Sequence, residues 1–267
     1  MINKGQTKAN EYVKTCPPEA CDTFQFMAKK LGLSVLHPGG LNATTKLAEL
    51  SGIKAESKII DLGCGKGSSS ILLARKHGCH VVGVDIDEGL LSTARGRAKR
   101  SNLAEMTEFR YADIENMPFE DDVFDGAISQ AVLVFTDKDR ALREVARVVK
   151  PGGFVGAVEL AWKQPPTEYI ARRVQETLCS VSIQADLHQL WQDRFQRAGL
   201  MVIHEELNDL HFTMGDMLRD EGLLRGLVCA VKGSVKPSYR ERLAQFSRLF
   251  EETEKYLGYG IYIGRVT

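Results

Sequence analysis

The sequence lacks the features that mark several large classes of protein. No apolar run reaches the roughly 18 residues that a membrane-spanning helix needs, so we expect no bilayer span. Residues 1–14 lack the apolar core of a signal peptide. Six cysteines among 267 residues are too few for a disulfide scaffold, which favours a reducing compartment. Together these absences predict a cytoplasmic protein.

The chain also lacks net charge, with 35 Lys and Arg against 35 Asp and Glu. No overall basic field is therefore available to hold nucleic acid or an anionic membrane surface, which leaves only local basic clusters for such partners. The basic run at residues 95–100 is interpreted as the solvated C-terminal end of a helix, where the helix dipole favours cations. We expect no nucleic-acid partner. The 43% apolar and 26% charged residues are typical of a globular protein, and the length suits one domain, or one domain with a cap.

Strand and helix patterns alternate from residue 57 onward. Strands are predicted at 58–62, 80–85, 109–112, 123–129 and 154–160, and helices at 68–76, 87–100 and 139–149. This alternation predicts a doubly wound, mostly parallel sheet with helices on both faces. A helix at 187–198 and strands at 201–206 and 259–266 would complete seven strands.

Further helices are predicted outside this core. Two lie near the N-terminus, at 18–31 and 41–50, and two more, at 213–232 and 236–257, precede the last strand. We predict that residues 1–56 cover the ligand site and that residues 57–267 form one domain. Within that domain, a helical cap over about 209–257 would cover one end of the sheet.

The most informative segment is the glycine turn at residues 61–67, Asp-Leu-Gly-Cys-Gly-Lys-Gly, between the first predicted strand and helix. Glycines let the chain turn sharply and bring its backbone against a ligand where any Cβ would collide. Asp85 ends the second predicted strand, where a carboxylate can accept hydrogen bonds from both hydroxyls of a ribose. The plainer alternative is that the glycines end a strand and the acid caps a helix.

Five motifs in order carry a family resemblance. The glycine turn is followed by Gly-Val-Asp at 83–85, Ala-Asp at 112–113 with Met-Pro-Phe at 117–119, Phe-Asp at 124–125, and Arg-Val-Val-Lys-Pro-Gly-Gly at 147–153. This series resembles the class I S-adenosylmethionine-dependent methyltransferases, in particular the small-molecule group that includes ubiquinone and menaquinone biosynthesis enzymes. The resemblance covers about residues 57–160. It implies a Rossmann-like fold with an antiparallel last strand.

The resemblance also implies a cofactor, S-adenosylmethionine, and a product, S-adenosylhomocysteine. Asp61 would lie near the methionine amino group, Asp85 would bind the ribose, and Asp113 would accept from the adenine amine. Ile86 and Ile114 would flank the adenine, and Gln130 would reach the methionine end. The implied cofactor-binding residues are Asp61, Gly63, Cys64, Gly65, Gly67, Asp85, Ile86, Asp113, Ile114 and Gln130.

Methyl transfer needs chiefly alignment and exclusion of water, so no catalytic dyad is required. Candidate catalytic residues on the substrate side are Tyr12, His37 and Glu159, with Trp162 beside them. Glu159 and Trp162 come at the carboxyl end of the fifth predicted strand, where open α/β sheets bind ligands. For each candidate, a purely structural role is the simpler alternative. No metal site is predicted.

Other functions stay open at this point. A nicotinamide-dependent dehydrogenase also has a glycine turn followed by an acid, but here Ser68 stands where its third glycine is expected and no Tyr-x-x-x-Lys pair is present. A non-catalytic S-adenosylmethionine-binding module is a third possibility. Cysteines 16, 21, 179 and 229 could gather as soft ligands, although buried cysteines are usually small hydrophobes. The predicted function is methyl transfer to a small-molecule acceptor.

Overall fold

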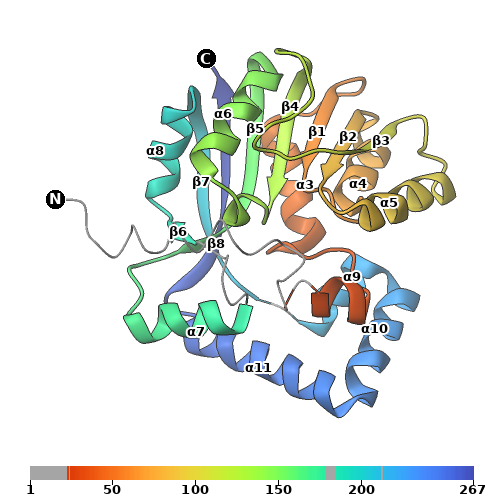
Figure 1. Ribbon diagram of the computed structural model, residues 1–267, viewed down its shortest axis with the longest axis vertical. Coiled ribbons are helices and arrows are strands. Elements are labelled where there is room, and N and C mark those ends of the chain that lie inside the picture. The colour runs from red at the N-terminus through yellow and green to blue at the C-terminus, as the bar shows by residue number, and fades with distance from the viewer. Residues whose placement is uncertain (1–22, 24, 179–184, 212) are drawn as a thin grey trace.

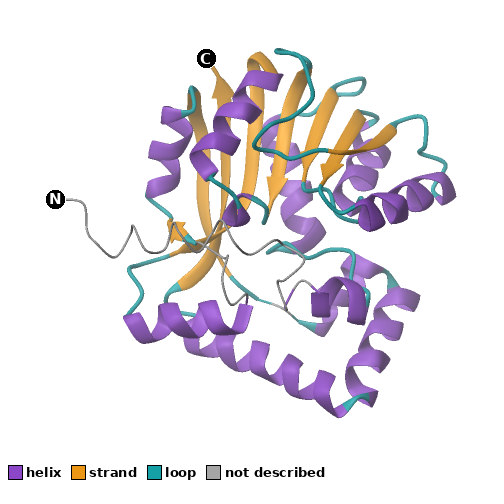
Figure 2. Cartoon of the chain, viewed as in Figure 1, coloured by secondary structure: helices purple, strands orange, loops and turns teal. Residues whose placement is uncertain are grey.

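The computed structural model describes residues 23, 25–178, 185–211 and 213–267. These residues form a twisted sheet of eight strands with helices on both faces and a group of helices across one end (Figures 1 and 2). The strands are β1 (Lys58–Leu62), β2 (His80–Asp85), β3 (Thr107–Tyr111), β4 (Phe124–Gln130), β5 (Val149–Trp162), β6 (Asp186–Leu187), β7 (Leu200–Asp209) and β8 (Leu257–Val266).

The helices occupy nearly all the connections between the strands. They are the π-helix η2 (Gln25–Leu31), α3 (Gly40–Ser51), α4 (Ser68–His77), α5 (Glu88–Arg100), the 3-10 turn η3 (Leu133–Phe135), α6 (Lys138–Val148), α7 (Glu168–Leu178), α8 (Leu190–Arg197), α9 (Met214–Glu221), α10 (Leu223–Val235) and α11 (Pro237–Thr253).

The strand order is β3-β2-β1-β4-β5-β8-β7, with the short β6 beside β5. Strands β1 to β5 pair in parallel, and β8 runs antiparallel to both β5 and β7. The order reverses between β1 and β4, which is the position where open α/β sheets bind ligands. The predicted doubly wound sheet with an antiparallel last strand is confirmed, and the neighbouring β6 adds one short strand to the seven expected.

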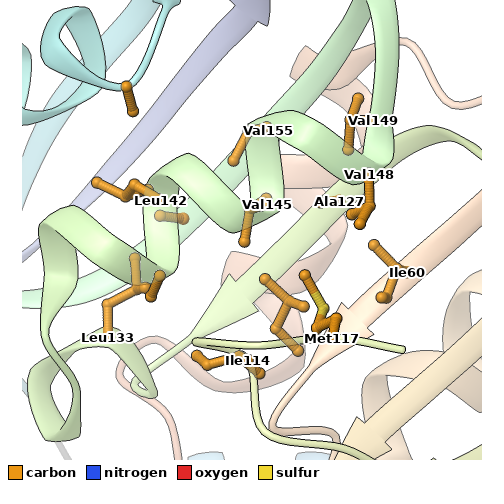
Figure 3. Close-up of a cluster of buried hydrophobic side chains, with 14 of the residues drawn as sticks. Ile60, Ile114, Met117, Ala127, Leu133, Leu142, Val145, Val148, Val149 and Val155 are labelled. Carbon is orange, nitrogen blue, oxygen red and sulfur yellow. The ribbon is translucent and has the colours of Figure 1, made fainter. Parts of the chain in front are cut away.

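Successive side chains of the parallel strands point to opposite faces of the sheet and pack into two separate hydrophobic cores. Ile60 points to one face, where it packs with Leu142 and Val145 of α6, and Figure 3 shows this cluster. Ile59, one residue earlier, points to the other face and joins a core with α3, α4 and α5. Because both faces of a parallel sheet are covered, its strands are apolar on both sides.

A third core lies between the carboxyl ends of the strands and the helices that cover them. It joins η2, α7, α9, α10 and α11 with the end of β5. Helices α9 to α11 form the cap inserted before the last strand, as predicted, but the chain breaks at Gly222 (φ 77°) into one helix more than expected. Helix α7 lies in residues that the sequence pattern left irregular. Of the predicted helix at 18–31, residues 18–22 and 24 lie outside the described residues.

No helix among the described residues is both long enough and apolar enough to cross a bilayer.

Candidate functional site

A cavity of about 850 Å³ lies between the carboxyl ends of β1, β2 and β4 and the helical cap. Three parts of the chain line it. The strand ends supply the glycine turn and the acids, residues 31–36 (here called the strap) cover them, and the cap closes the far side. The predicted cofactor residues that line the cavity are Asp61, Gly63, Cys64, Gly65, Asp85, Ile86, Asp113, Ile114 and Gln130.

The glycine turn leaves room for a ligand at one particular position. Gly65 has φ 53°, and apart from the glycine and its two chain neighbours no heavy atom of the described residues lies within 4 Å of the place where its Cβ would be. A ligand can therefore approach the backbone there more closely than any side chain would allow. Gly63, in contrast, packs against Val132, whose Cγ2 lies 2.4 Å from a Cβ built at that glycine. The turn is thus held against the segment that follows β4.

Asp85 lies across the turn from Gly65. Its Oδ2 accepts the Gly65 backbone N–H at 2.8 Å, and its Oδ1 accepts the Asp87 N–H at 2.9 Å. Burial raises the pKa of this carboxyl above its usual value, whereas the two N–H donors favour its charged form. An ionised carboxylate has about four acceptor positions, so lone pairs remain for ligand hydroxyls.

Asp61 is the most enclosed acid of the cavity. The residue is 2% exposed, and its carboxyl accepts a hydrogen bond from the Ser70 hydroxyl at 2.5 Å. Desolvation raises its pKa to about 7, with the Ser70 hydrogen bond opposing and the Asp85 charge adding to the shift. At neutral pH this carboxyl is poised between its charged and neutral forms.

The opposite wall carries Ile86, Asp113 and Ile114. Ile86 is exposed, Ile114 is buried, and Asp113 Oδ1 accepts the Glu115 N–H at 2.9 Å. Tyr111 also lines this wall with 62% of its surface exposed. The sequence analysis missed Tyr111, although an aromatic two residues before the motif acid was available as a signal.

Three side chains form a hydrogen-bonded chain on the methionine side of the predicted site. Gln130 Nε2 donates to Thr44 Oγ1 at 2.8 Å, and Thr44 Oγ1 lies 3.3 Å from His37 Nε2. His37 Nδ1 lies 3.2 Å from the Pro38 carbonyl, so a neutral ring donating from Nδ1 and accepting at Nε2 satisfies every partner. Desolvation lowers the pKa of His37 to about 4, which keeps the ring neutral.

Gln130 has one orphaned atom. Its Oε1 is buried and has no hydrogen-bond partner among the described residues. The next residue, Ala131, takes a left-handed conformation with φ 56°, which costs energy for a residue with a Cβ. Both features lie at the cavity wall, and the orphaned oxygen is an acceptor that a ligand N–H would satisfy.

Glu159 does not lie in the cavity, and its expected placement on the substrate side was wrong. Strand side chains alternate between faces, so Leu160 lines the cavity while Glu159 points beneath the turn after β4. There Oε1 accepts the N–H groups of Val132 and Leu133 and the Ser129 hydroxyl, each at 3.1 Å. Burial raises its pKa to about 7. The residue supports the loop that shapes the site.

The remaining predicted residues have other surroundings. Gly67 is not in the cavity wall, and a Cβ there would collide with Phe109 and Ala94. Trp162 is buried in the third core, between the strand ends and the helices that cover them. Tyr12 lies outside the described residues, as do Cys16, Cys21 and Cys179, while Cys229 is free and buried. The described part of the chain contains no group of three or more His, Cys, Asp or Glu side chains arranged to hold a metal.

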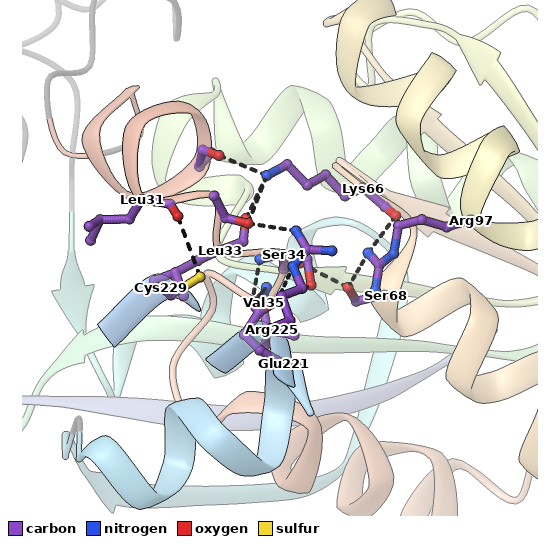
Figure 4. Close-up of polar contacts among 12 residues, drawn as sticks. Leu31, Leu33, Ser34, Val35, Lys66, Ser68, Arg97, Glu221, Arg225 and Cys229 are labelled. Atoms are coloured by element: carbon purple, nitrogen blue, oxygen red, sulfur yellow. Dashed lines mark hydrogen bonds and ion pairs between the residues drawn. The ribbon is translucent and has the colours of Figure 1, made fainter. Parts of the chain in front are cut away.

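The strap is bound from two sides (Figure 4). Lys66 of the glycine turn donates from Nζ to the carbonyl of Leu33 in the strap at 2.8 Å and to that of Ala28, in η2 just before the strap, at 2.7 Å. From the cap, Glu221 accepts the N–H groups of Ser34 and Val35. The strap therefore connects the turn to the cap across the cavity.

The cap and the elements next to it supply an apolar wall. Its residues are Leu160 of β5, Leu178 of α7, and Phe246 and Phe250 of α11. The cavity lining also includes the polar residues Asp209, His211, Asp216, Arg219, Asp220 and Tyr259. The sequence analysis named none of these residues as site residues, because their positions along the chain give no sign that the cap brings them to the turn.

The glycine turn and Asp85, here called the cradle, form a site of the kind that binds nucleotides in open α/β proteins. Comparisons with known proteins identify the family. Residues 60–156 match the family described as methyltransferase domain. The chain is 30% identical over 207 residues to O-methyltransferase rstn1 of Aspergillus nomiae, covering 74% of this chain and 82% of that protein. It is 32% identical over 149 residues to the ubiquinone/menaquinone biosynthesis C-methyltransferase UbiE of Vibrio parahaemolyticus, covering 54% and 58%.

A solved structure shows the same fold. It is an S-adenosylmethionine-dependent methyltransferase from Geobacter sulfurreducens in complex with S-adenosylhomocysteine, with a TM-score of 0.69, 21% identity, and coverage of 92% of this chain and 98% of that one. The chain belongs to the class I S-adenosylmethionine-dependent methyltransferases. S-adenosylmethionine is accordingly its cofactor. The open backbone at Gly65 and the orphaned Gln130 oxygen fit such a ligand.

Proposed function

We propose that this methyltransferase acts on a small, largely apolar acceptor held between the glycine turn and the cap. The observation that carries the proposal is that one cavity contains both the cradle at Asp85 and the apolar wall at Phe246 and Phe250. The Vibrio parahaemolyticus relative is named for a quinone pathway, which supports a small-molecule acceptor.

We assign the cofactor contacts as follows. Asp85 accepts the ribose hydroxyls, Asp113 accepts the adenine amine between Ile86 and Ile114, and the backbone at Gly63, Cys64 and Gly65 lies along the methionine and ribose. Asp61 and Gln130 Oε1 serve the methionine amino end. Gly67 contributes by packing α4 against α5 and β3 rather than by contact.

Bound S-adenosylmethionine supplies a methyl group that is already activated by a positively charged sulfur. The chain's own task is therefore to align the acceptor and exclude water. The strap and cap close over the turn and provide that shelter, consistent with the proposed division into a covering segment at 1–56 and a domain at 57–267 with its cap at about 209–257.

His37 fits a positioning role better than that of a general base. Its Nε2 lone pair is engaged by the Thr44 hydroxyl, and a histidine with a pKa of about 4 accepts a proton weakly at neutral pH. We propose that His37 and Thr44 hold Gln130 toward the methionine end of the site. Acceptors that need no protein base, or that lose a proton to water, suit this arrangement.

The test is release of S-adenosylhomocysteine by the full chain with matched pairs of acceptors. Each pair carries the same hydroxyl, amine or carbon nucleophile on an apolar or a polar body. We expect turnover with apolar bodies, and Phe250→Asn should raise KM for them about thirtyfold, because burying a phenylalanine contributes about 2 kcal/mol.

Tyr169→Asn is the matched control for that substitution, since Tyr169 is an exposed aromatic residue of α7 outside the cavity wall. It should leave KM unchanged. Turnover confined to the polar members of the pairs would contradict the proposal.

A further inference from the structure

Helix α10 turns its large apolar side chains outward. Leu224 is 80% exposed and Val235 is 71% exposed, and the same stripe includes Leu227, Val228 and Val231. These positions recur every three or four residues, so they lie along one face of the helix. Isolated exposed apolar residues are ordinary, but a contiguous stripe of them marks a surface that contacts something apolar. In Figure 1 the helix lies at the outer edge of the molecule.

The opposite face explains why the helix cannot rotate to bury this stripe. Gly226, Cys229 and Gly233 are the residues of α10 that are buried. A Cβ at Gly226 would lie 2.8 Å from Leu218 Cδ2, and one at Gly233 would lie 2.8 Å from Leu243 Cδ1. Small residues thus seat α10 closely against α9 and α11. The usual arrangement of a surface helix, with the large apolar face inside, is reversed.

The charged residues of α10, and of the chain that follows it up to residue 240, have one sign. Residues 222–240 contain Arg225, Lys232, Lys236 and Arg240 and no Asp or Glu. The preceding acid, Glu221, has a buried side chain that pairs with Arg225 and the strap. Lys232, Lys236 and Arg240 are exposed, and the next acid along the chain is Glu241. A second copy docked symmetrically on this face would bring like charges together, which disfavours self-association.

We propose that the exposed face of α10 docks on an anionic lipid bilayer surface. Leu224, Val231 and Val235 would enter the boundary between headgroups and acyl chains, and Lys232 and Lys236 would lie at the phosphates. Interfacial helices combine an apolar face with basic residues in this way, and anionic lipids attract each nearby cation.

A smaller cavity lies directly behind the docking face. It has a volume of about 300 Å³, lies between α10 and α11, and is lined by Ala230 and Leu243 among other residues. It shares Met27, Phe246 and Phe250 with the wall of the main cavity. A molecule dissolved in the bilayer would therefore meet the apolar side of the site next to the docked helix.

The experiment is sedimentation of the full chain with vesicles of phosphatidylglycerol or of phosphatidylcholine, at low and high salt. We expect binding to the phosphatidylglycerol vesicles, at least fivefold weaker binding to phosphatidylcholine, and weaker binding as salt rises. Leu224→Asp with Val231→Asp should lower binding at least tenfold. Lys232→Gln with Lys236→Gln should reduce it at least fivefold and flatten the salt dependence.

Met201→Asp is the matched control, because Met201 is a similarly exposed apolar residue on β7 away from α10. It should bind vesicles like the unaltered chain. Absence of vesicle binding, or equal binding by the Leu224 and Val231 variant, would overturn the proposal. So would a dimer in sedimentation equilibrium that this variant dissociates, since a second copy would then be the occupant. The readout needs no turnover, so it stands apart from the acceptor test.

Discussion

Asp61 and Asp85 are two carboxyls of one cavity in different surroundings. Asp85 ends its strand and receives two backbone N–H groups, so hydrogen bonds partly offset its burial. Asp61 lies inside β1 with the Ser70 hydroxyl as its side-chain donor, and its pKa rises to about 7. The charge of Asp61 therefore changes near neutral pH.

We predict that affinity for S-adenosylmethionine falls about tenfold between pH 8 and pH 6. Below a pKa of about 7 the Asp61 carboxyl becomes neutral and loses its attraction for the ligand's amino group, so binding must first remove a proton. Calorimetric titrations at several pH values measure this. In Asp61→Asn the dependence should flatten, and an unchanged slope in that variant would contradict the assignment.

The motif residues could be predicted because each motif is local. Gly63, Gly65 and Asp85 follow from the need for a tight turn and for an acid at the end of the second strand, and all three line the cavity. Tyr111 and the cap phenylalanines were missed because nothing in their immediate sequence shows which distant segment they face.

At the scale of the secondary-structure elements, strand β5 was predicted correctly, but the direction in which its Glu159 side chain points was not. The rule for open sheets indicates the edge at which ligands bind, and β5 does end there. It does not indicate which of two adjacent side chains faces the ligand. Glu159 and Leu160 point to opposite sides, and the acid supports the turn after β4.

Glu159 makes stability depend on pH. Burial raises the pKa of its carboxyl to about 7, so between about pH 4.5 and pH 7 the folded chain binds a proton that the unfolded chain has released. The free energy of unfolding must therefore fall as pH rises through this window. We predict that Glu159→Gln, which keeps an acceptor oxygen and does not ionise, reduces that fall by about 2 kcal/mol.

Urea unfolding of both proteins at pH 5 and pH 8 tests this prediction. Asp61 contributes a decline of the same sign, so the variant should keep part of the slope. An equal or steeper decline in Glu159→Gln would show that the carboxyl does not carry the proton.

For the whole molecule, the sheet and the covering segments differ in how far they could be predicted. The hydrophobic periodicity of the sequence predicts the alternating strands and helices. The antiparallel β8 was expected from the resemblance to the family. The cap was placed correctly before β8, but α7 was not foreseen, since it lies in a polar stretch and becomes ordered by packing against α11. The strap depends on contacts between distant positions, such as Lys66 to Leu33, 33 positions apart, which a local sequence pattern does not predict.

The central claim is that this fold grips an adenosyl sulfonium ligand through the glycine turn and Asp85. Isothermal calorimetry of the full chain with S-adenosylmethionine, and separately with NAD, tests it most directly. The account predicts one-to-one binding of S-adenosylmethionine, no binding of NAD, and at least about tenfold weaker binding in Asp85→Asn, because hydrogen bonds to a charged acceptor contribute about 1.5–3 kcal/mol. Binding of NAD in place of S-adenosylmethionine, or equal affinity in the variant, would contradict it.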